Sequence, residues 1–278
     1  MGVEEMRATT AAGLPMVRAS PPPLGLAATE LPRAITEMGA LAMMQPLLSQ
    51  IPQGDGHAVM VLPGFTADDT STRVLRRFLR SKGYDVHPWG LGRNLGPSSM
   101  GDVADRLALR LELMKERSGR KVSLVGWSLG GIYARELARA EPDLVRQVIS
   151  LGSPFGGHPS ATNVWRLFQM IAGENIDIEE LEDEQRLMAL PVDGVPATAI
   201  YSKADGVASW RICKELPTDQ TDNIEVNASH LGLGFNPFVF YAIADRLGLA
   251  ENDWAPFDRD ITGWRKLAYP SSGHDAAH

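Results

Sequence analysis

The sequence predicts an α/β fold in which a mostly parallel sheet carries helices on both of its faces. From residue 57 onward, short apolar runs of strand length alternate with longer segments that repeat apolar residues at helical spacing. Loop-forming residues separate these segments, as short connections between strands and helices require. The predicted strands are residues 57–62, 84–87, 121–125, 145–151, 197–201 and 224–226.

The periodic segments between these strands predict the covering helices, among them 102–117, a helix beginning at Leu129, and 237–247. The alternation stops between residues 157 and 190, where two helical patterns follow one another. We therefore expect a small helical cap, inserted after the strand 145–151. A length of 278 residues suits one α/β domain with such an insertion, which we place at residues 24–270.

The segments that flank the alternating region differ from it in pattern. Residues 1–23 end in three prolines and show no periodicity, so they predict a disordered arm, and residues 271–278 predict a tail. Residues 24–51 predict one or two amphipathic helices that pack against the domain. A partner-binding helix is the alternative. The apolar stripe behind this prediction consists of Leu31, Ile35, Met38, Leu41 and Ala42.

Composition limits the classes of partner. The 44% hydrophobic content is that of an ordinary globular protein, and the net charge of −7 argues against a nucleic-acid partner. Cys213 is the single cysteine, so no intrachain disulfide can form. We also expect a cytoplasmic protein without stable membrane insertion, because no secretory signal is legible and charged residues interrupt the apolar residues 24–48.

The segment Gly126-Trp127-Ser128-Leu129-Gly130 carries the strongest chemical signal. It follows a predicted strand and precedes a predicted helix, which is the context of a nucleophile elbow. In such a bend the serine adopts a strained backbone conformation, and the glycines let the strand and the helix approach closely. Ser128 is therefore the candidate nucleophile.

A serine hydroxyl needs a base within hydrogen-bond reach, because it is a weak nucleophile at neutral pH. Among the six histidines, His230 lies in a loop between the last strand and the last helix, downstream of Ser128. His57 and His87 precede Ser128, and His158 opens the predicted cap. His230 is the candidate general base.

An acid must hold that base in one tautomer. Asp205 directly follows the strand 197–201 and gives the chain order serine, aspartate, histidine. Asp193, Asp222 and Glu225 are competitors, although Asp193 precedes its strand and the other two lie close to the next strand. Asp205 is the candidate acid.

Acyl transfer also needs donors for an oxyanion, normally the amide after the nucleophile and an amide from the loop after an early strand. Here these are the amides of Leu129 and Phe65. Phe65 belongs to Pro63-Gly64-Phe65, which follows the first predicted strand.

These residues resemble the α/β-hydrolase superfamily and, within it, bacterial esterases and lipases, over residues 57–248. The run Gly152-Ser153-Pro154-Phe155-Gly156-Gly157 is similar to a lipase segment, and residues 89–94 resemble a loop that would brace the oxyanion loop. The early loop departs from the His-Gly pattern of other lipases. No antiparallel strands are legible before residue 57, so we expect a reduced sheet.

The resemblance implies hydrolysis of a small carboxylic ester through an acyl-enzyme, without a metal or organic cofactor. An apolar acyl or aromatic group would contact Trp127 and a roof formed by Leu167, Phe168 and Ile171 in the cap. An acyltransferase or thioesterase with the same residues is one alternative, and a binding protein on this scaffold is another. A homo-oligomer is possible.

Overall fold

A single parallel sheet forms the centre of the molecule. The computed structural model describes residues 17–96, 100–165, 185–260 and 263–271, and within these ranges it has six strands in the order β2-β1-β3-β4-β5-β6. All neighbouring strands pair in parallel, which confirms the predicted sheet. The strands are β1 (Ala58–Leu62), β2 (Asp85–Pro88), β3 (Val122–Trp127), β4 (Val145–Leu151), β5 (Ala197–Tyr201) and β6 (Thr221–Glu225).

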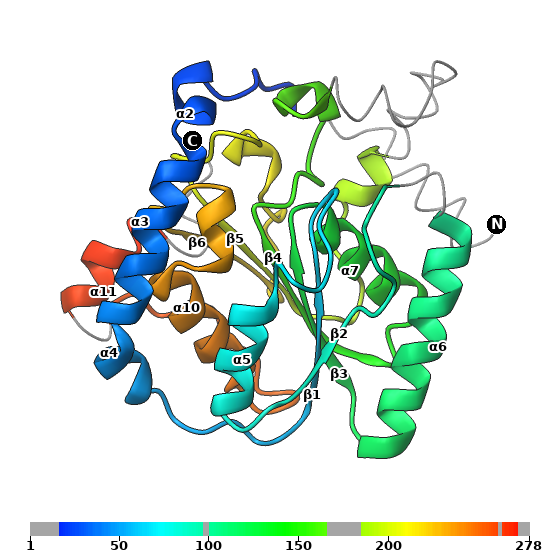
Figure 1. Ribbon diagram of the computed structural model, residues 1–278. Helices are drawn as coiled ribbons and strands as arrows, with labels where there is room; N and C mark the ends of the chain where they lie inside the picture. Colours follow the sequence, from blue (N-terminus) through cyan, green and yellow to red (C-terminus); the bar gives the residue numbers. More distant parts are fainter. Residues whose placement is uncertain (1–16, 97–99, 166–184, 261–262, 272–278) are drawn as a thin grey trace.

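Helices cover both faces of this sheet (Figure 1). On one face, α6 (Met100–Ser118) and α7 (Leu129–Ala140) pack on Ala58, Met60 and Leu62. On the other, α5 (Arg73–Ser81) and α10 (Pro237–Leu247) pack on Val59 and Val61. Because successive strand residues point to opposite faces, one apolar strand supplies both cores.

The last strand, β6, begins three residues earlier than its sequence predicts. Thr221, Asp222 and Asn223 are polar but buried. Asp222 accepts hydrogen bonds from the amides of Asn223 and Phe257, and Asn223 exchanges two hydrogen bonds with the Glu215 backbone. Since these partners satisfy the buried polar groups, the strand needs no apolar pattern there.

The N-terminal segment forms α2 (Leu24–Ala28), α3 (Glu30–Met43) and α4 (Gln45–Ser49). The prediction of helices against the domain is correct, but the predicted face of α3 is wrong. Leu31, Ile35 and Met38 are 63%, 62% and 47% exposed. Of the predicted stripe only Leu41 is buried, and the helix turns it toward the domain together with Glu30 and Ala34, because backbone amides in the facing loops need acceptors.

Part of the predicted N-terminal arm lies against the body of the protein. Val17 forms a bridge with Gly157, and Asn163 donates a hydrogen bond from Nδ2 to the Pro22 carbonyl. The C-terminal helix α11 (Gly263–Ala268), which has no counterpart in the predicted elements, packs Trp264 against Tyr241 of α10.

The chain leaves the sheet after β4 and returns at β5, which is the predicted position of the cap. In this region the structure describes a short 3-10 helix, η2 (Pro159–Ala161), and a helical stretch at residues 185–189. The predicted roof residues Leu167, Phe168 and Ile171 lie outside the described residues. No helix in the described ranges combines the length and the hydropathy that crossing a bilayer requires.

Candidate functional site

The candidate residues lie at one edge of the sheet. Ser128 directly follows β3, Asp205 lies in the loop after β5, and His230 lies in the loop after β6. The carboxyl ends of parallel strands meet at one edge, and open α/β sheets place their ligand sites there. Residues that are distant in the chain therefore share one region of the surface.

Ser128 occupies a tight bend between β3 and α7. Its backbone has φ 54° and ψ −122°, a region that residues with a side chain rarely adopt. Its amide donates to the Leu151 carbonyl at 2.8 Å, and its carbonyl accepts from the Gly131 amide at 2.9 Å. These bonds anchor the strained residue to β4 and α7, so the bend is fixed by its surroundings.

The flanking glycines permit this bend. A Cβ atom at Gly126 would overlap the Gly130 carbonyl oxygen, and one at Gly130 would overlap the Leu62 carbonyl oxygen of β1. Each clash involves backbone, which cannot move aside as a flexible side chain can. The spacing of glycines around Ser128 thus follows from the close approach of β1, β3 and α7.

His230 and Asp205 form a buried pair. Asp205 Oδ2 lies 2.6 Å from His230 Nδ1, and Asp205 Oδ1 accepts from the amides of Val207 and Ala208 at 2.7 and 2.8 Å. Both side chains are buried. The aspartate is held by its own loop, and it engages Nδ1, which leaves Nε2 of the ring for other partners.

The surroundings of His230 raise its pKa. Burial alone would lower it, but the charge of Asp205 and the hydrogen bond to it, together with the more distant charge of Glu30, outweigh burial. The charged form of the ring is therefore stabilised in this site. Among the interactions of the described residues, the acid that pairs with the ring is Asp205. Of the competing acids, Asp222 bonds to backbone amides and Glu225 pairs with Lys203.

Two contacts place the His230 loop beside the Ser128 bend. Trp127 is buried and donates from Nε1 to the His230 carbonyl at 3.1 Å. Gly152, with φ 55°, passes so close that a Cβ atom would lie 3.2 Å from His230 Nδ1. Because Trp127 directly precedes Ser128, and Gly152 directly follows the Leu151 carbonyl that binds the Ser128 amide, these contacts bring the serine and histidine loops together.

No hydrogen bond joins the Ser128 hydroxyl to the His230 ring among the bonds of the described residues. Hydrogen bonds between a nucleophile and its base are often longer in a free enzyme than in its complex with substrate. Trp127 supports the base loop through its indole nitrogen, and its predicted contact with substrate stays a prediction.

The loop after β1 lies next to Ser128. A Cβ atom at Gly64 would lie 3.2 Å from Ser128 Cβ, so the candidate donor Phe65 follows a residue in contact with the bend. Leu129, the other candidate donor, is the first residue of α7. The residue after Phe65, Thr66, has φ 61° and donates its amide to the Asn94 carbonyl at 2.6 Å.

Asn94 holds this loop in place through hydrogen bonds. It is fully buried, donates from Nδ2 to the Pro63 carbonyl at 2.9 Å, and donates its amide to the Ala67 carbonyl at 2.8 Å. The loop is therefore held on both sides of Phe65. This is the bracing expected of the segment 89–94, and Asn94 is the residue that provides it.

Sequence reasoning missed two carboxylates of α3. Glu30 accepts hydrogen bonds from the amides of Gly206, His230 and Leu231, and Glu37 accepts from the amide of Ser229. The available signal was a pair of glutamates two helical turns apart in a largely apolar segment. Helix α3 thereby contacts the loops of both Asp205 and His230.

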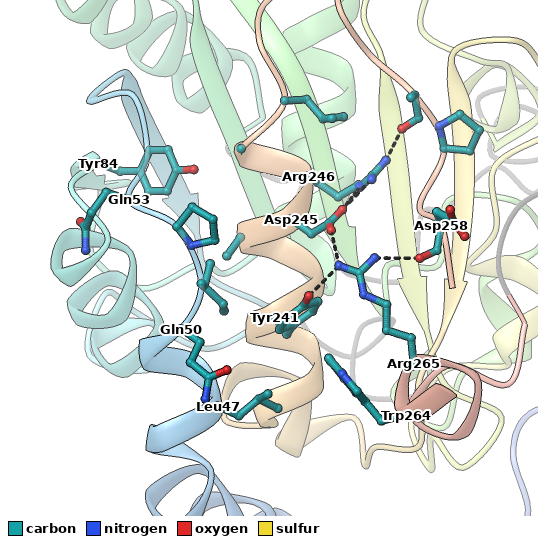
Figure 2. Close-up of a pocket in the computed structure, with 17 residues that line it drawn as sticks. Leu47, Gln50, Gln53, Tyr84, Tyr241, Asp245, Arg246, Asp258, Trp264 and Arg265 are labelled. Atoms are coloured by element: carbon teal, nitrogen blue, oxygen red, sulfur yellow. Dashed lines mark hydrogen bonds and ion pairs between the residues drawn. The ribbon is translucent and has the colours of Figure 1, made fainter. Parts of the chain in front are cut away.

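A cavity of about 630 Å³ lies away from these residues. Its walls include Gln53 and Tyr84, which precede β1 and β2, so it opens at the opposite edge of the sheet. Figure 2 shows Arg265 reaching Tyr241 and Asp245 along its wall. The arginine is bound within the protein, and the cavity is separate from the candidate catalytic residues. No group of three potential metal ligands gathers within the described part of the chain.

Comparisons with known sequences give short matches to esterases. No protein-family model matches the chain. A carboxylesterase of Bacillus subtilis is 24% identical over 151 residues, which cover 49% of this chain and 61% of that protein. A pimeloyl-[acyl-carrier protein] methyl ester esterase of Yersinia pseudotuberculosis is 29% identical over 69 residues, 25% of this chain and 24% of that protein. The chain thus spans from about a quarter to three fifths of these relatives.

Solved structures match over most of the chain. A structure reported for LipS and LipT, two metagenome-derived lipolytic enzymes, has a TM-score of 0.52 at 17% identity and covers 70% of this chain and 93% of its own. The mature Bacillus licheniformis lipase BlEst2 has a TM-score of 0.53 at 16% identity, and the match covers 72% of this chain and 95% of the lipase. At such identities the likeness establishes the fold.

Proposed function

Because this chain has the α/β-hydrolase fold, we propose that it is a carboxylic ester hydrolase with Ser128 as nucleophile, His230 as general base and Asp205 as the acid that orients the base. The Asp205–His230 pair beside the bend at Ser128 is the observation that carries this proposal. The esterase names of the partial sequence relatives support the class of reaction.

The hydrogen bond between Asp205 and His230 explains how the base would work. With Nδ1 hydrogen-bonded to Asp205 Oδ2, the neutral ring presents Nε2 as the proton acceptor. As the Ser128 hydroxyl attacks the ester carbonyl, its proton passes to Nε2. The imidazolium that forms is stabilised by the adjacent carboxylate, in agreement with the raised pKa of His230.

The rest of the cycle has two halves. The tetrahedral intermediate collapses when His230 gives its proton to the leaving alkoxide, which departs as the alcohol and leaves an acyl group on Ser128. A water then attacks the acyl-enzyme as His230 takes its proton, which forms a second tetrahedral intermediate. When this intermediate collapses, His230 returns the proton to the Ser128 oxygen and the carboxylic acid is released. We assign the oxyanion of both intermediates to the amides of Leu129 and Phe65.

The substrate class follows from the same proposal. We expect a small-molecule ester with an apolar acyl or aromatic group. The wall that would select it is the predicted cap face of Leu167, Phe168 and Ile171, outside the described residues. The curated relatives are named for a carboxylic ester and for a methyl ester attached to a carrier protein, and their names supply the class of bond.

The test is hydrolysis of p-nitrophenyl esters of increasing acyl length by the wild type and by Ser128→Ala. We expect kcat of Ser128→Ala to fall by about 10⁴-fold or more while the protein stays folded. Ser150→Ala is the matched control, since Ser150 is buried on the neighbouring strand β4 and its hydroxyl has no hydrogen-bond partner among the described residues. Undiminished hydrolysis by folded Ser128→Ala would refute the proposal.

A further inference from the structure

Glu30 connects the loops of the proposed acid and base. Its Oε1 accepts from the amides of Gly206 and His230 at 2.7 and 3.1 Å, and its Oε2 accepts from the amide of Leu231 at 2.8 Å. Gly206 directly follows Asp205. The Glu30 carboxylate, on a helix outside the sheet, thus binds the backbone amide next to Asp205 and the backbone amide of His230.

Arg33 holds Glu30 in this position. It lies one turn further along α3, donates from Nη2 to Glu30 Oε1 at 2.9 Å, and donates from Nη1 to the Ala204 carbonyl at 2.6 Å. Ala204 immediately precedes Asp205. The arginine therefore pairs the buried charge of Glu30 and fixes the other side of the acid loop.

The burial of Glu30 needs an explanation, because glutamates are almost never buried without partners. Glu30 is 4% exposed, and its partners are three backbone amides and the guanidinium of Arg33. The amides it binds have no alternative acceptor in the described hydrogen-bond network. The arrangement adds a second connection between two loops that already meet through Asp205 and His230 and through Ser202 and Ala228.

We propose that Glu30 is a positioning residue of this site, which holds the His230 ring against Asp205 and stabilises the imidazolium that forms when Ser128 is deprotonated. This inference rests on the proposed function. Glu30 touches neither substrate nor the reacting atoms. It acts through the backbone of His230 and through its charge.

The charge of Glu30 gives its positioning role a measurable effect on the pKa of His230. Burial lowers the pKa of His230, whereas Asp205 and, to a smaller extent, Glu30 raise it. Other ionisable groups around the two loops in the described part of the chain are Arg33, which pairs with Glu30, and Glu37, which binds the Ser229 amide. Lys203 of the acid loop pairs with Glu225, and Cys213 lies near Asp205. Removing the charge of Glu30 should therefore lower the pKa of the ring.

The test compares Glu30→Gln with Glu37→Gln. Glu37 holds the same base loop through the Ser229 amide and Asn236 Nδ2, but no hydrogen bond in the described network joins it to His230 or to the Asp205 loop. We expect the acid limb of kcat/KM to move to lower pH in Glu30→Gln, with kcat about tenfold lower and KM within about twofold. Glu37→Gln should keep the wild-type midpoint.

An NMR titration of the His230 ring without substrate provides a readout that does not need activity, and it should show the same downward shift in Glu30→Gln. An unshifted ring pKa in Glu30→Gln, or an equal shift in Glu37→Gln, would overturn the inference. Full hydrolysis by Ser128→Ala would instead overturn the proposed function, so the two failures are distinguishable.

Glu30→Asp covers the case in which Glu30→Gln does not fold. This variant keeps the charge but shortens the side chain by one methylene, so the carboxylate can no longer reach both loops. We expect its kcat per folded molecule to fall by about tenfold. Because the charge is kept, the midpoint of its acid limb should lie closer to the wild-type value than that of Glu30→Gln does. A wild-type kcat in Glu30→Asp would overturn the inference.

Discussion

Asp205 Oδ2 lies 2.6 Å from His230 Nδ1, although the two residues are 25 positions apart in the chain. The contact forms because β5 and β6 are parallel neighbours, so the loops at their carboxyl ends emerge side by side. Two further amides hold the aspartate from within its own loop. The orientation of the ring is therefore set by the sheet and by local hydrogen bonds together.

Asp205→Asn tests the importance of that orientation. The amide nearly preserves the shape of the side chain, but it can place a donor against Nδ1 and favour the wrong tautomer. We expect kcat for a p-nitrophenyl ester to fall by about 10³- to 10⁴-fold. Asp222→Asn is the control, because Asp222 is buried but bonds to backbone amides, and its kcat per folded molecule should stay near that of the wild type. Asp205→Asn with kcat within tenfold of wild type would exclude Asp205 as the acid.

The pH dependence of kcat/KM follows from the raised pKa of His230. The base must be neutral to accept a proton, so activity should be lost as the pH falls through the folded-state pKa. Because Asp205 and Glu30 raise that pKa above the usual 6.5, the acid limb should have its midpoint above 6.5. The measurement is a pH profile with an ester that does not ionise. A midpoint at or below 6.5 would contradict this account of the site.

The same raised pKa predicts a dependence of stability on pH. A group with a higher pKa in the folded state stabilises the fold fully below the unfolded pKa of 6.5, and this stabilisation disappears as the pH rises through the folded value. The free energy of unfolding, measured by denaturant titration at several pH values across that range, should fall more steeply with rising pH in the wild type than in His230→Gln. Parallel curves would show that the ring is not stabilised in its charged form.

Gly126→Ala tests the close approach at the bend. The added methyl group would overlap backbone atoms of Gly130 and Gly131, so we expect a loss of about 3 kcal/mol in the free energy of unfolding. Gly39→Ala is the control, because a Cβ atom there meets nothing within 4 Å on helix α3, and it should raise stability by about 0.5–1 kcal/mol. Equal stabilities of the two variants would show that the bend is looser than described.

Asn94→Ala tests the brace behind the proposed oxyanion loop. The substitution leaves the buried Pro63 carbonyl without its donor, which should cost about 1–3 kcal/mol of stability. A displaced Phe65 amide weakens transition-state stabilisation, so we expect kcat to fall by about tenfold with little change in KM. An unchanged kcat alongside reduced stability would limit Asn94 to a structural role.

Strand positions and the order of the candidate residues could be predicted because they depend on local patterns. The apolar runs mark the strands, and a serine between paired glycines marks the bend. Asp205 could be chosen because parallel strands place their following loops at one edge. The location of the parallel sheet could likewise be predicted, since β1 and β5 are buried along their whole length and read as nearly continuous apolar runs.

The inward face of α3 could not be predicted from periodicity. Leu31, Ile35 and Met38 form the more apolar stripe, yet the buried face carries Glu30. The amides that bind Glu30 come from loops about 175 to 200 residues away, and no local pattern reveals that they need acceptors. Tertiary hydrogen bonding outweighs apolar matching at this helix.

The central claim is that Ser128 is activated by His230, and covalent labelling tests it most directly. The wild type and His230→Gln would be treated with a fluorophosphonate, and the labelled peptide identified by mass spectrometry. We predict a single adduct on Ser128 in the wild type and at least about a hundredfold slower labelling in His230→Gln. Labelling of folded wild type at another residue, or none at Ser128, would contradict the account.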